Sequence, residues 1–335
     1  MQQNEQLRQR LTKAIIARED LLSGGHLDAV RLYNGFYEGP PQLVVDLYAS
    51  TLVLYTYEHG RTNWKVTLDN TCSLLLELLP WVDCILHKDH GTNEPAARRG
   101  TIIFGGNPAE KIKEHGIWHA VDLMINQDAS FYLDTRILRR WLIENAKGWR
   151  VLNTFAYTGS LGVAALAGGA LQVEQVDRSR KFLNLARRSG MLNRLDIGLM
   201  KLRRTDFFTM VAAYKRQGVL FDCVIVDPPF FSATAKGTID LVGSSLHVIN
   251  KLRPLVAHGG RLVSINNALF LSGAELMRGL NELCEDGFLS IEAIIPVPDD
   301  ITGYPETIIS APPRDPKPFN HPTKMVILSV VRKNP

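Results

Sequence analysis

This chain of 335 residues has few cysteines and only a small excess of positive charge. The four cysteines are far apart and form no Cys-x-x-Cys pair, so neither a metal site nor a disulfide framework is expected. A formal net charge of +4 permits binding to nucleic acid but does not require it. These shortages exclude a disulfide-stapled secreted scaffold and predict a reduced, cytoplasmic setting.

Long apolar runs are missing as well. Residues 1–19 are polar with apolar residues at helical spacing, which predicts an amphipathic helix and not a signal peptide. No run approaches the length that spans a membrane, so no membrane partner is expected. The length itself predicts two domains, because one hydrophobic core rarely grows to this size.

Residues 1–125 read as a smaller α+β domain that follows the leading helix. Short β-branched and aromatic runs bounded by Gly, Pro and Ser predict its strands at 29–35, 42–48, 51–57, 82–86, 101–104 and 118–125. A helix is expected at 64–79, where apolar positions recur at helical spacing up to Pro80.

Residues 126–335 alternate helix and strand, which predicts a Rossmann-like α/β domain with a mainly parallel sheet. Helices are expected at 138–146, 161–169, 179–193, 238–256 and 274–285. Strands are expected at 150–155, 171–176, 218–226, 260–266, 291–297 and 324–332. The last two strands have no helix between them, which predicts an antiparallel hairpin at one edge. The long loop before the final strand is expected to tie these edge strands together; the alternative is that Phe319, His321 and Lys324 line the substrate entrance.

The first turn of the predicted sheet suggests a cofactor. It reads Phe155-Ala156-Tyr157-Thr158-Gly159, in which Gly159 permits a tight turn and a close approach of a ligand. A dinucleotide fingerprint requires glycine where this chain has Tyr157, and this opposes a nicotinamide oxidoreductase. S-adenosylmethionine carries no phosphate and needs only one such glycine, so we expect it as the cofactor.

Two carboxylates follow in the order that this cofactor needs. Asp177 ends the next strand, where it would accept the ribose hydroxyls; the alternative is a turn that caps the helix beginning at Ser179. Asp206 would accept the adenine amine while Phe207 packs on its ring; the alternative is an ordinary helix N-cap.

The strongest chemical signal is Asp227-Pro228-Pro229-Phe230 at the carboxyl end of an apolar strand, where open α/β sheets bind ligands. The prolines fix the turn, so the Asp227 carboxylate and the Pro228 carbonyl would present rigid acceptors beside an aromatic ring. This arrangement suits a base nitrogen, with Phe230 stacking on the base.

The positions of the cysteines limit which atom can be methylated. Methylation at carbon 5 of cytosine needs a cysteine nucleophile, and neither the Asp-Pro turn nor the end of the next strand supplies one. That strand ends instead in Asn266 and Asn267, which would read the edge of a base or simply terminate the strand. A nitrogen of RNA, guanine N7 or an exocyclic amine, is therefore the expected acceptor; a nitrogen of a protein or small molecule is the alternative.

These motifs jointly resemble the bacterial ribosomal RNA large-subunit methyltransferase I/K family of class I enzymes. The resemblance runs from about residue 30 to the end and includes residues 127–136, which are similar to the family's Gln-Lys-Thr-Gly-Phe-Phe-Leu-Asp-Gln-Arg segment. It implies that S-adenosylmethionine is the methyl donor, that ribosomal RNA is the substrate and that the protein forms a homodimer. The residues that it places at or near the cofactor are Phe155, Ala156, Tyr157, Thr158, Gly159, Asp177, Ser179, Asp206, Phe207 and Asp227.

The segment 127–136 would also contribute Phe131 and Arg136, which either close over the cofactor or serve in helix packing and a surface ion pair. Two departures from the family pattern concern the RNA substrate. Asp128, Ala129 and Ser130 replace Lys, Thr and Gly. We also expect only the short leading helix, and no PUA-like RNA-binding domain, before the central domain.

Overall fold

The computed structural model describes residues 2–57, 64–229, 231–234, 237–240, 245–311 and 315–333. It divides into two compact units. The N-terminal unit comprises Met1–Leu133 together with Pro298–Pro313, and the C-terminal unit comprises Asp134–Val297 together with Arg314–Pro335. The boundary thus falls after Leu133, whereas the sequence suggested residue 125, and a late segment of the chain belongs to the first unit.

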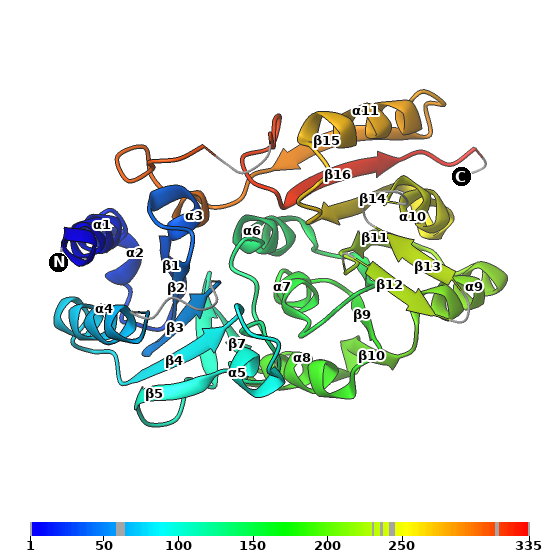
Figure 1. Cartoon of the computed structure of the whole chain (residues 1–335). Helices are drawn as coiled ribbons and strands as arrows, with labels where there is room; N and C mark the ends of the chain where they lie inside the picture. Colours follow the sequence, from blue (N-terminus) through cyan, green and yellow to red (C-terminus); the bar gives the residue numbers. More distant parts are fainter. Residues whose placement is uncertain are drawn as a thin grey trace. The chain divides into compact units, whose positions relative to one another are not determined.

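The N-terminal unit is built on a five-stranded sheet in the order β1-β2-β3-β4-β5. Its strands are β1 (Ala29–Asn34), β2 (Leu43–Tyr48), β3 (Thr51–Thr56), β4 (Cys84–Asp89) and β5 (Thr101–Gly105). Only β3 and β4 pair in parallel, because α4 (Trp64–Leu78) crosses between them. Helices α1 (Gln2–Ile16) and α4 lie side by side in Figure 1 and close an apolar core that contains Leu11, Leu32, Leu54 and Leu75.

Smaller elements complete this unit. They are α2 (Glu19–Leu22), α3 (Gly35–Glu38), α5 (Pro95–Arg99), the hairpin β6 (Lys111–Glu114) and β7 (Ile117–Ala120), and α12 (Asp299–Thr302). The expected strand 118–125 is therefore too long. It stops at Ala120 because the chain turns there: the Asp122 carboxylate accepts a hydrogen bond from the amide of Met124.

The C-terminal unit confirms the predicted Rossmann-like architecture. Its seven-stranded sheet has the order β10-β9-β8-β11-β14-β16-β15. The strands are β8 (Arg150–Asn153), β9 (Gln172–Asp177), β10 (Met200–Arg204), β11 (Phe221–Val226), β14 (Val256–Asn266), β15 (Leu289–Ile295) and β16 (Lys324–Val330). Strands β8 to β11 and β14 run parallel, and β16 lies antiparallel between β14 and β15. The predicted edge hairpin is therefore present.

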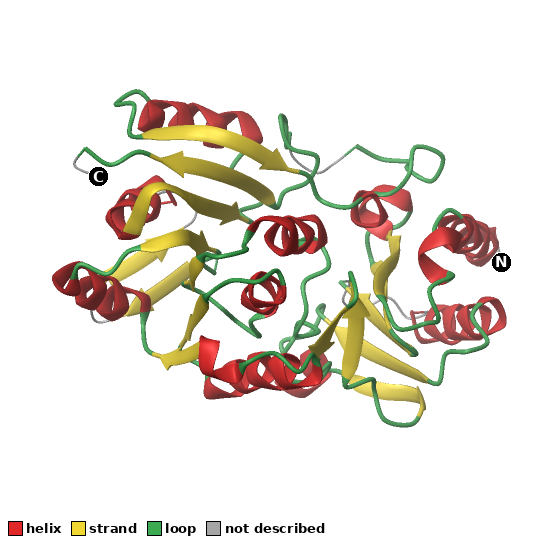
Figure 2. Ribbon diagram, turned by 180° about the vertical axis from the view of Figure 1, so that it is seen from behind, coloured by secondary structure: helices red, strands yellow, loops and turns green. Residues whose placement is uncertain are grey.

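Helices cover both faces of this sheet (Figures 1 and 2). One face carries α6 (Arg136–Asn145), α7 (Ser160–Ala167) and α8 (Arg180–Leu192), and the other carries α9 (Phe207–Gln217), α10 (Ser245–Leu252) and α11 (Gly273–Cys284). The main core lies under α9 to α11 and includes Phe221, Ile249, Leu280 and Phe319. The loop residue Phe319 is 5% exposed, so this loop does pack on the sheet as expected.

One predicted helix is wrong. Residues 238–256 do not form a continuous helix, because 237–240 belong to β13 (Gly237–Asp240), which pairs with β12 (Phe231–Thr234). The helix of this region is α10, which is followed by a 3₁₀ turn at Arg253–Leu255 and then by β14. Pro254 explains the stop, since a proline cannot donate the backbone hydrogen bond that continues a helix.

Candidate active site

The predicted site residues of the C-terminal unit lie where consecutive parallel strands end. Strand β8 leads into the turn 154–159, β9 ends at Asp177, β11 ends just before Asp227, and β14 ends at Asn266. Because the carboxyl ends of parallel strands meet at one edge of the sheet, these residues share that edge. Phe230 lies outside the described residues, so its expected role as a stacking partner stays a prediction.

The turn after β8 is shaped by Gly159. Its φ of 80° is left-handed, and a Cβ there would lie 2.4 Å from the Cβ of Ala186 on α8 and 2.7 Å from Nε2 of the buried Gln175. The Gln175 amide donates to the Gly159 carbonyl at 2.9 Å and accepts from Asn153 at 3.0 Å. Glycine is therefore required both by the backbone conformation and by close packing on α8 and β9. The sequence showed the first requirement and gave no sign of Gln175.

Asp177 closes the same turn from the neighbouring strand. One carboxylate oxygen accepts from the Tyr157 amide at 2.9 Å and the other from the Ser179 amide at 2.7 Å. The side chain is half-buried. Burial raises the pKa of Asp177 above its ordinary value, while these amides oppose the shift. The amide of Arg178 also contributes a hydrogen bond. The carboxylate still has acceptor capacity left for a hydroxyl donor, which fits a hydroxyl of a ribose.

Ser179 and Asp206 serve as helix caps. The Ser179 hydroxyl accepts from the Phe182 amide at the start of α8. Asp206 caps α9 by accepting from both the amide and the hydroxyl of Thr209. Phe207 is buried and stacks on Phe155, with ring centroids 4.9 Å apart. The capping alternative that the sequence left open for Asp206 is thus observed, and its contact with an adenine stays a prediction.

Asp227 follows β11 directly and is half-buried. Burial, and after it the charge of Asp134, raises the pKa of Asp227 to about 7. Pro228 is buried behind it and Pro229 is exposed. The carboxylate therefore stands on a fixed turn with an unusually high proton affinity, which is typical of a functional site.

Asp134 is a site residue that sequence reasoning did not single out. It lies two residues before α6, and one of its oxygens accepts from the Thr323 hydroxyl at 2.8 Å. The other oxygen is buried and has no hydrogen-bond partner among the described residues. No spacing in the sequence signals that the charge of Asp134 acts on Asp227, because this effect depends on how the folded sheet places the start of α6.

The end of β14 is held by the final strand. Asn266 is buried and accepts from the Ala268 amide at 2.9 Å, whereas Asn267 is exposed. Lys324, the register partner of Asn266 on β16, donates to the carbonyls of Ala268 at 3.0 Å and Pro322 at 2.6 Å. Burial lowers the pKa of Lys324 to about 8. Asn266 thus shapes the turn, and Asn267 is the residue that solvent reaches.

The two remaining candidates, Phe131 and Arg136, belong to different units. Phe131 belongs to the N-terminal unit, where it is buried against His119 with ring centroids 4.9 Å apart, and its carbonyl accepts from the Tyr48 hydroxyl at 3.1 Å. Arg136 begins α6 in the C-terminal unit, in the same turn as Asp134. Phe131 therefore packs against β7 and not at the start of a helix, and a role in closing over the cofactor stays a prediction for both.

Within the described ranges, no group of three or more His, Cys, Asp or Glu side chains is arranged to hold a metal ion. Within the same ranges, no helix is both long and apolar enough to cross a membrane.

A parallel sheet with one reversed strand next to its edge, a glycine turn after the first strand and carboxylates at the next strand ends define a class I methyltransferase-type site. A family model described as S-adenosylmethionine-dependent methyltransferase matches residues 98–281. The chain belongs to this family, whose cofactor is S-adenosylmethionine. The residues fit that cofactor, because Asp177 offers acceptors for a ribose and the turn at Gly159 contains no phosphate-binding pattern.

Individual relatives agree with this assignment. The chain is 34% identical over 267 residues to a ribosomal RNA large subunit methyltransferase I from Aeromonas salmonicida, and this match covers 76% of the chain and 65% of the relative. The chain thus spans less than two thirds of the length of that relative. The sequence-based resemblance to this family is confirmed.

Solved structures show the same fold. SMU.776, described as a methyltransferase and crystallised with S-adenosylhomocysteine, superposes with a TM-score of 0.85 at 19% identity over 98% of this chain and 82% of its own. A methyltransferase from Streptococcus mutans gives 0.82 at 19% identity, over 98% and 81%. Both likenesses extend over nearly the whole chain and therefore include the N-terminal unit.

Proposed function

We propose that this protein methylates a base nitrogen of ribosomal RNA, with guanine N7 or an exocyclic amine as the acceptor. The observation that carries the proposal is Asp227 on its rigid Pro-Pro turn at the carboxyl end of β11. The ribosomal RNA methyltransferase named among the relatives supports RNA as the substrate. A homodimer, which the family resemblance implies, stays a prediction.

Cysteine placement supports nitrogen as the acceptor atom. All four cysteines are free, and none lies at the carboxyl edge of the parallel strands. Cys223 is inside β11, where burial raises its pKa to about 12 and keeps the thiol protonated. No thiolate is therefore placed to attack carbon 6 of a pyrimidine, which methylation at carbon 5 requires.

Nitrogen transfer needs positioning and electrostatics more than a covalent intermediate. When bound, S-adenosylmethionine supplies a methyl group on a sulfonium. An acceptor lone pair would take this methyl group in line and leave a neutral thioether, and an exocyclic amine would then release one proton to solvent. Asp227 and the Pro228 carbonyl would hold an exocyclic amine by its hydrogens; at N7 the Asp227 carboxylate would offset the developing positive charge. Asn267 is the exposed residue at this edge that could contact the base.

Mass spectrometry of nucleosides from ribosomal RNA tests the proposal. A strain lacking this protein should lose one methylated nucleoside, which wild-type protein restores and Asp227→Ala does not. Asp222→Ala, at the opposite end of the same strand, is the matched control and should restore it. An unchanged nucleoside inventory in the deletion strain would reject ribosomal RNA as the substrate and favour a protein or small-molecule nitrogen as the acceptor.

A further inference from the structure

The C-terminal unit has a concentration of positive charge around the sheet edge that β10 forms. Residues 178–216 contain eleven Lys or Arg and two Asp or Glu, an excess of nine. The whole chain has an excess of only four, so the rest of the chain is net negative by five. The two acidic residues are Asp196, which caps the turn before β10, and Asp206, which caps α9. The small overall charge of the chain therefore conceals a strong local separation of charge.

Two elements display these cations within the same unit. Strand β10 is the outermost strand of its sheet, and α8 packs against β10 and its neighbour β9. The side chains of Arg180, Lys181 and Arg187 on α8 have no ion-pair or hydrogen-bond partner among the described residues. The exposed cations that we term the β10 edge surface are Arg180, Lys181, Arg187, Lys201, Arg203 and Arg204.

On β10, one buried carboxylate holds two of these cations in place. Glu174 of β9 has a side chain that is 4% exposed, and its oxygens lie 3.8 Å from the Lys201 ammonium and 3.3 Å from Nε of Arg203. The same carboxylate accepts from the Tyr214 hydroxyl. The side chains of Lys201 and Arg203 remain 46% and 51% exposed. Two fixed cations share one negative charge, so one positive charge is left facing solvent.

The third cation of β10 connects this surface to the cofactor site. Arg204 is the register partner of Asp177, and its Nε donates to the Arg178 carbonyl at 3.3 Å. The β10 edge surface therefore begins at the turn that is expected to hold the ribose. The sheet order separates the ends of β10 and β11 by three strand spacings of about 4.8 Å, roughly 14 Å in total. Asp227 follows β11, so the surface lies within a few nucleotides of the acceptor position.

The stability of the fold does not explain the cations on α8. Arg180 and Lys181 stand in the first turn of the helix, which contains no acidic residue. Cations are unfavourable there, because the helix dipole places partial positive charge at the N-terminus. Basic side chains on an exposed edge strand discourage pairing with another sheet, which accounts for β10 but not for a helix. Residues that break a local rule without a structural gain are typical of functional surfaces.

We propose that the β10 edge surface binds the phosphate backbone of the RNA substrate. This inference rests on the proposed function and deepens it, because it names the part of the protein that holds the RNA. From Arg180 to Arg187 the helix rises about 10 Å, so its cations form a row. A row of cations fits a chain that carries one negative charge per nucleotide, and Arg and Lys donate charge-assisted hydrogen bonds to phosphate oxygens. Such contacts position a nucleic acid without reading its sequence.

Fluorescence anisotropy with a labelled single-stranded RNA of about 20 nucleotides, longer than a typical single-stranded site, tests the proposal. The triple variant Arg180→Gln/Lys181→Gln/Arg187→Gln should bind this RNA at least about tenfold more weakly in roughly 0.1 M salt. The slope of log K against log salt concentration should become shallower by about 2, because each lost phosphate contact removes roughly 0.7.

The matched control removes three exposed cations elsewhere on the protein and ends at the same net charge. It is Lys13→Gln/Arg278→Gln/Lys333→Gln, whose side chains also have no partner among the described residues. This control should keep the affinity and the salt slope of the wild type. A general effect of net charge would weaken both triple variants equally, so the comparison isolates the β10 edge surface.

Two further measurements separate a lost contact from a lost fold. The α8 variant should melt no lower than the wild type, because it removes two cations from the positive end of a helix. It should also bind S-adenosylhomocysteine as the wild type does. With ribosomal RNA from the deletion strain as substrate, its KM should rise while kcat changes little, as expected when binding is lost and chemistry is kept.

The outcomes distinguish this inference from the proposed function. If the α8 variant and the control bind RNA alike, or if wild-type binding does not depend on salt, the inference fails. The proposed function is then decided separately, by the nucleoside inventory of the deletion strain. Tighter binding of a polyglutamate peptide than of the RNA by wild-type protein would also overturn the inference, in favour of an acidic protein partner.

Discussion

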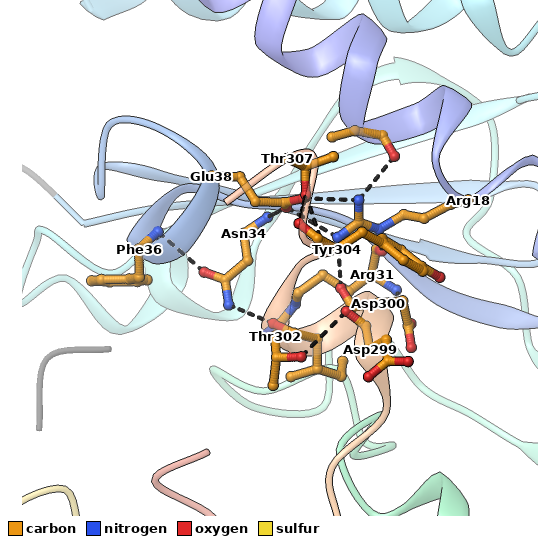
Figure 3. Close-up of polar contacts among 12 residues, drawn as sticks. Arg18, Arg31, Asn34, Phe36, Glu38, Asp299, Asp300, Thr302, Tyr304 and Thr307 are labelled. Atoms are coloured by element: carbon orange, nitrogen blue, oxygen red, sulfur yellow. Dashed lines mark hydrogen bonds and ion pairs between the residues drawn. The ribbon is translucent and has the colours of Figure 1, made fainter. Parts of the chain in front are cut away.

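Arg18 and Glu38 form a fully buried ion pair in which each terminal nitrogen of the guanidinium donates to one carboxylate oxygen at 3.0 Å. The remaining Arg18 donors reach the carbonyls of Ala14, Arg31 and Asp300, as Figure 3 shows in part. Glu38 accepts in addition from the Asn34 amide and the Thr307 hydroxyl. The pair therefore joins the leading helix, the first strand and the late segment 298–313 within one unit.

Breaking this pair should be costly. Glu38→Gln removes the charge that compensates Arg18 in the interior, and we expect a loss of about 3–5 kcal/mol in the free energy of unfolding. Urea denaturation measures it. The matched control is Glu77→Gln, which removes the partner of Arg8 in an ion pair whose side chains are 50% and 62% exposed; it should cost less than about 1 kcal/mol. Equal losses would mean that burial of the Arg18 pair contributes nothing.

Asp227 should make the folded protein less stable as the pH rises. Its pKa is about 7 when folded and about 4 when unfolded, so the folded state retains a proton that the unfolded state loses. Asp227→Asn should therefore be more stable than the wild type by about 2 kcal/mol at pH 8, allowing for its partial exposure, with no difference near pH 3.5. Thermal melts at several pH values measure this.

The control for this pH effect is Asp286, which should change the stability of the folded state with pH in the opposite direction. A hydrogen bond from the Phe288 amide and the charge of Arg253 lower the pKa of Asp286, so it stabilises the folded state above its unfolded pKa and loses that effect in acid. Asp286→Asn should therefore be less stable than the wild type at neutral pH and equal to it at low pH. The same sign in both variants would refute the assignment for Asp227.

Asp177 should be necessary for cofactor affinity. Asp177→Ala removes a charged acceptor from the two ribose hydroxyls, and we expect S-adenosylhomocysteine to bind about 100-fold more weakly in calorimetry. Asp196→Ala is the control, because Asp196 accepts from the amide two residues later just as Asp177 does, but on an exposed turn. Unchanged affinity in Asp177→Ala would remove this residue from the cofactor site.

The destabilisation caused by replacing Gly159 has two parts, backbone strain and side-chain packing. Gly159→Ala and Gly148→Ala both place a side chain at a φ of 80°, and each should cost about 1 kcal/mol for that backbone conformation alone. A Cβ at Gly148 meets nothing within 4 Å, whereas at Gly159 it meets the Cβ of Ala186 and the side chain of Gln175. Gly159→Ala should therefore be the more destabilising of the two in denaturant titrations. Equal costs would show that both Ala186 and Gln175 move aside freely.

Much of the C-terminal unit could be predicted because its signals are local. Apolar runs such as 221–226 form buried parallel strands, and the turns after them carry Gly159, Asp177 and Asp227 at one edge. Asp134 could not be found in this way, since its effect on Asp227 depends on how α6 packs on the sheet. The false helix at 238–256 came from apolar spacing in a segment that also forms a hairpin strand.

For a related reason, the position of the late segment 298–313 could not be predicted from the sequence. Its residues carry no helical or strand period, and the sequence read it as a loop. Its place depends on partners far away in the chain: Asp300 accepts from the Arg31 amide, Asn34 donates to the Ile301 carbonyl and Arg18 stacks on the Tyr304 ring (Figure 3). Such contacts are visible only after both segments have folded.

The route of the chain through β15, segment 298–313 and β16 sets an order of assembly during synthesis. Arg18 and Glu38 gain their last hydrogen-bond partners only when the ribosome has made residue 307, and the sheet of the second unit is incomplete until β16 enters between β14 and β15. A nascent chain released before that point would leave both halves unfinished together.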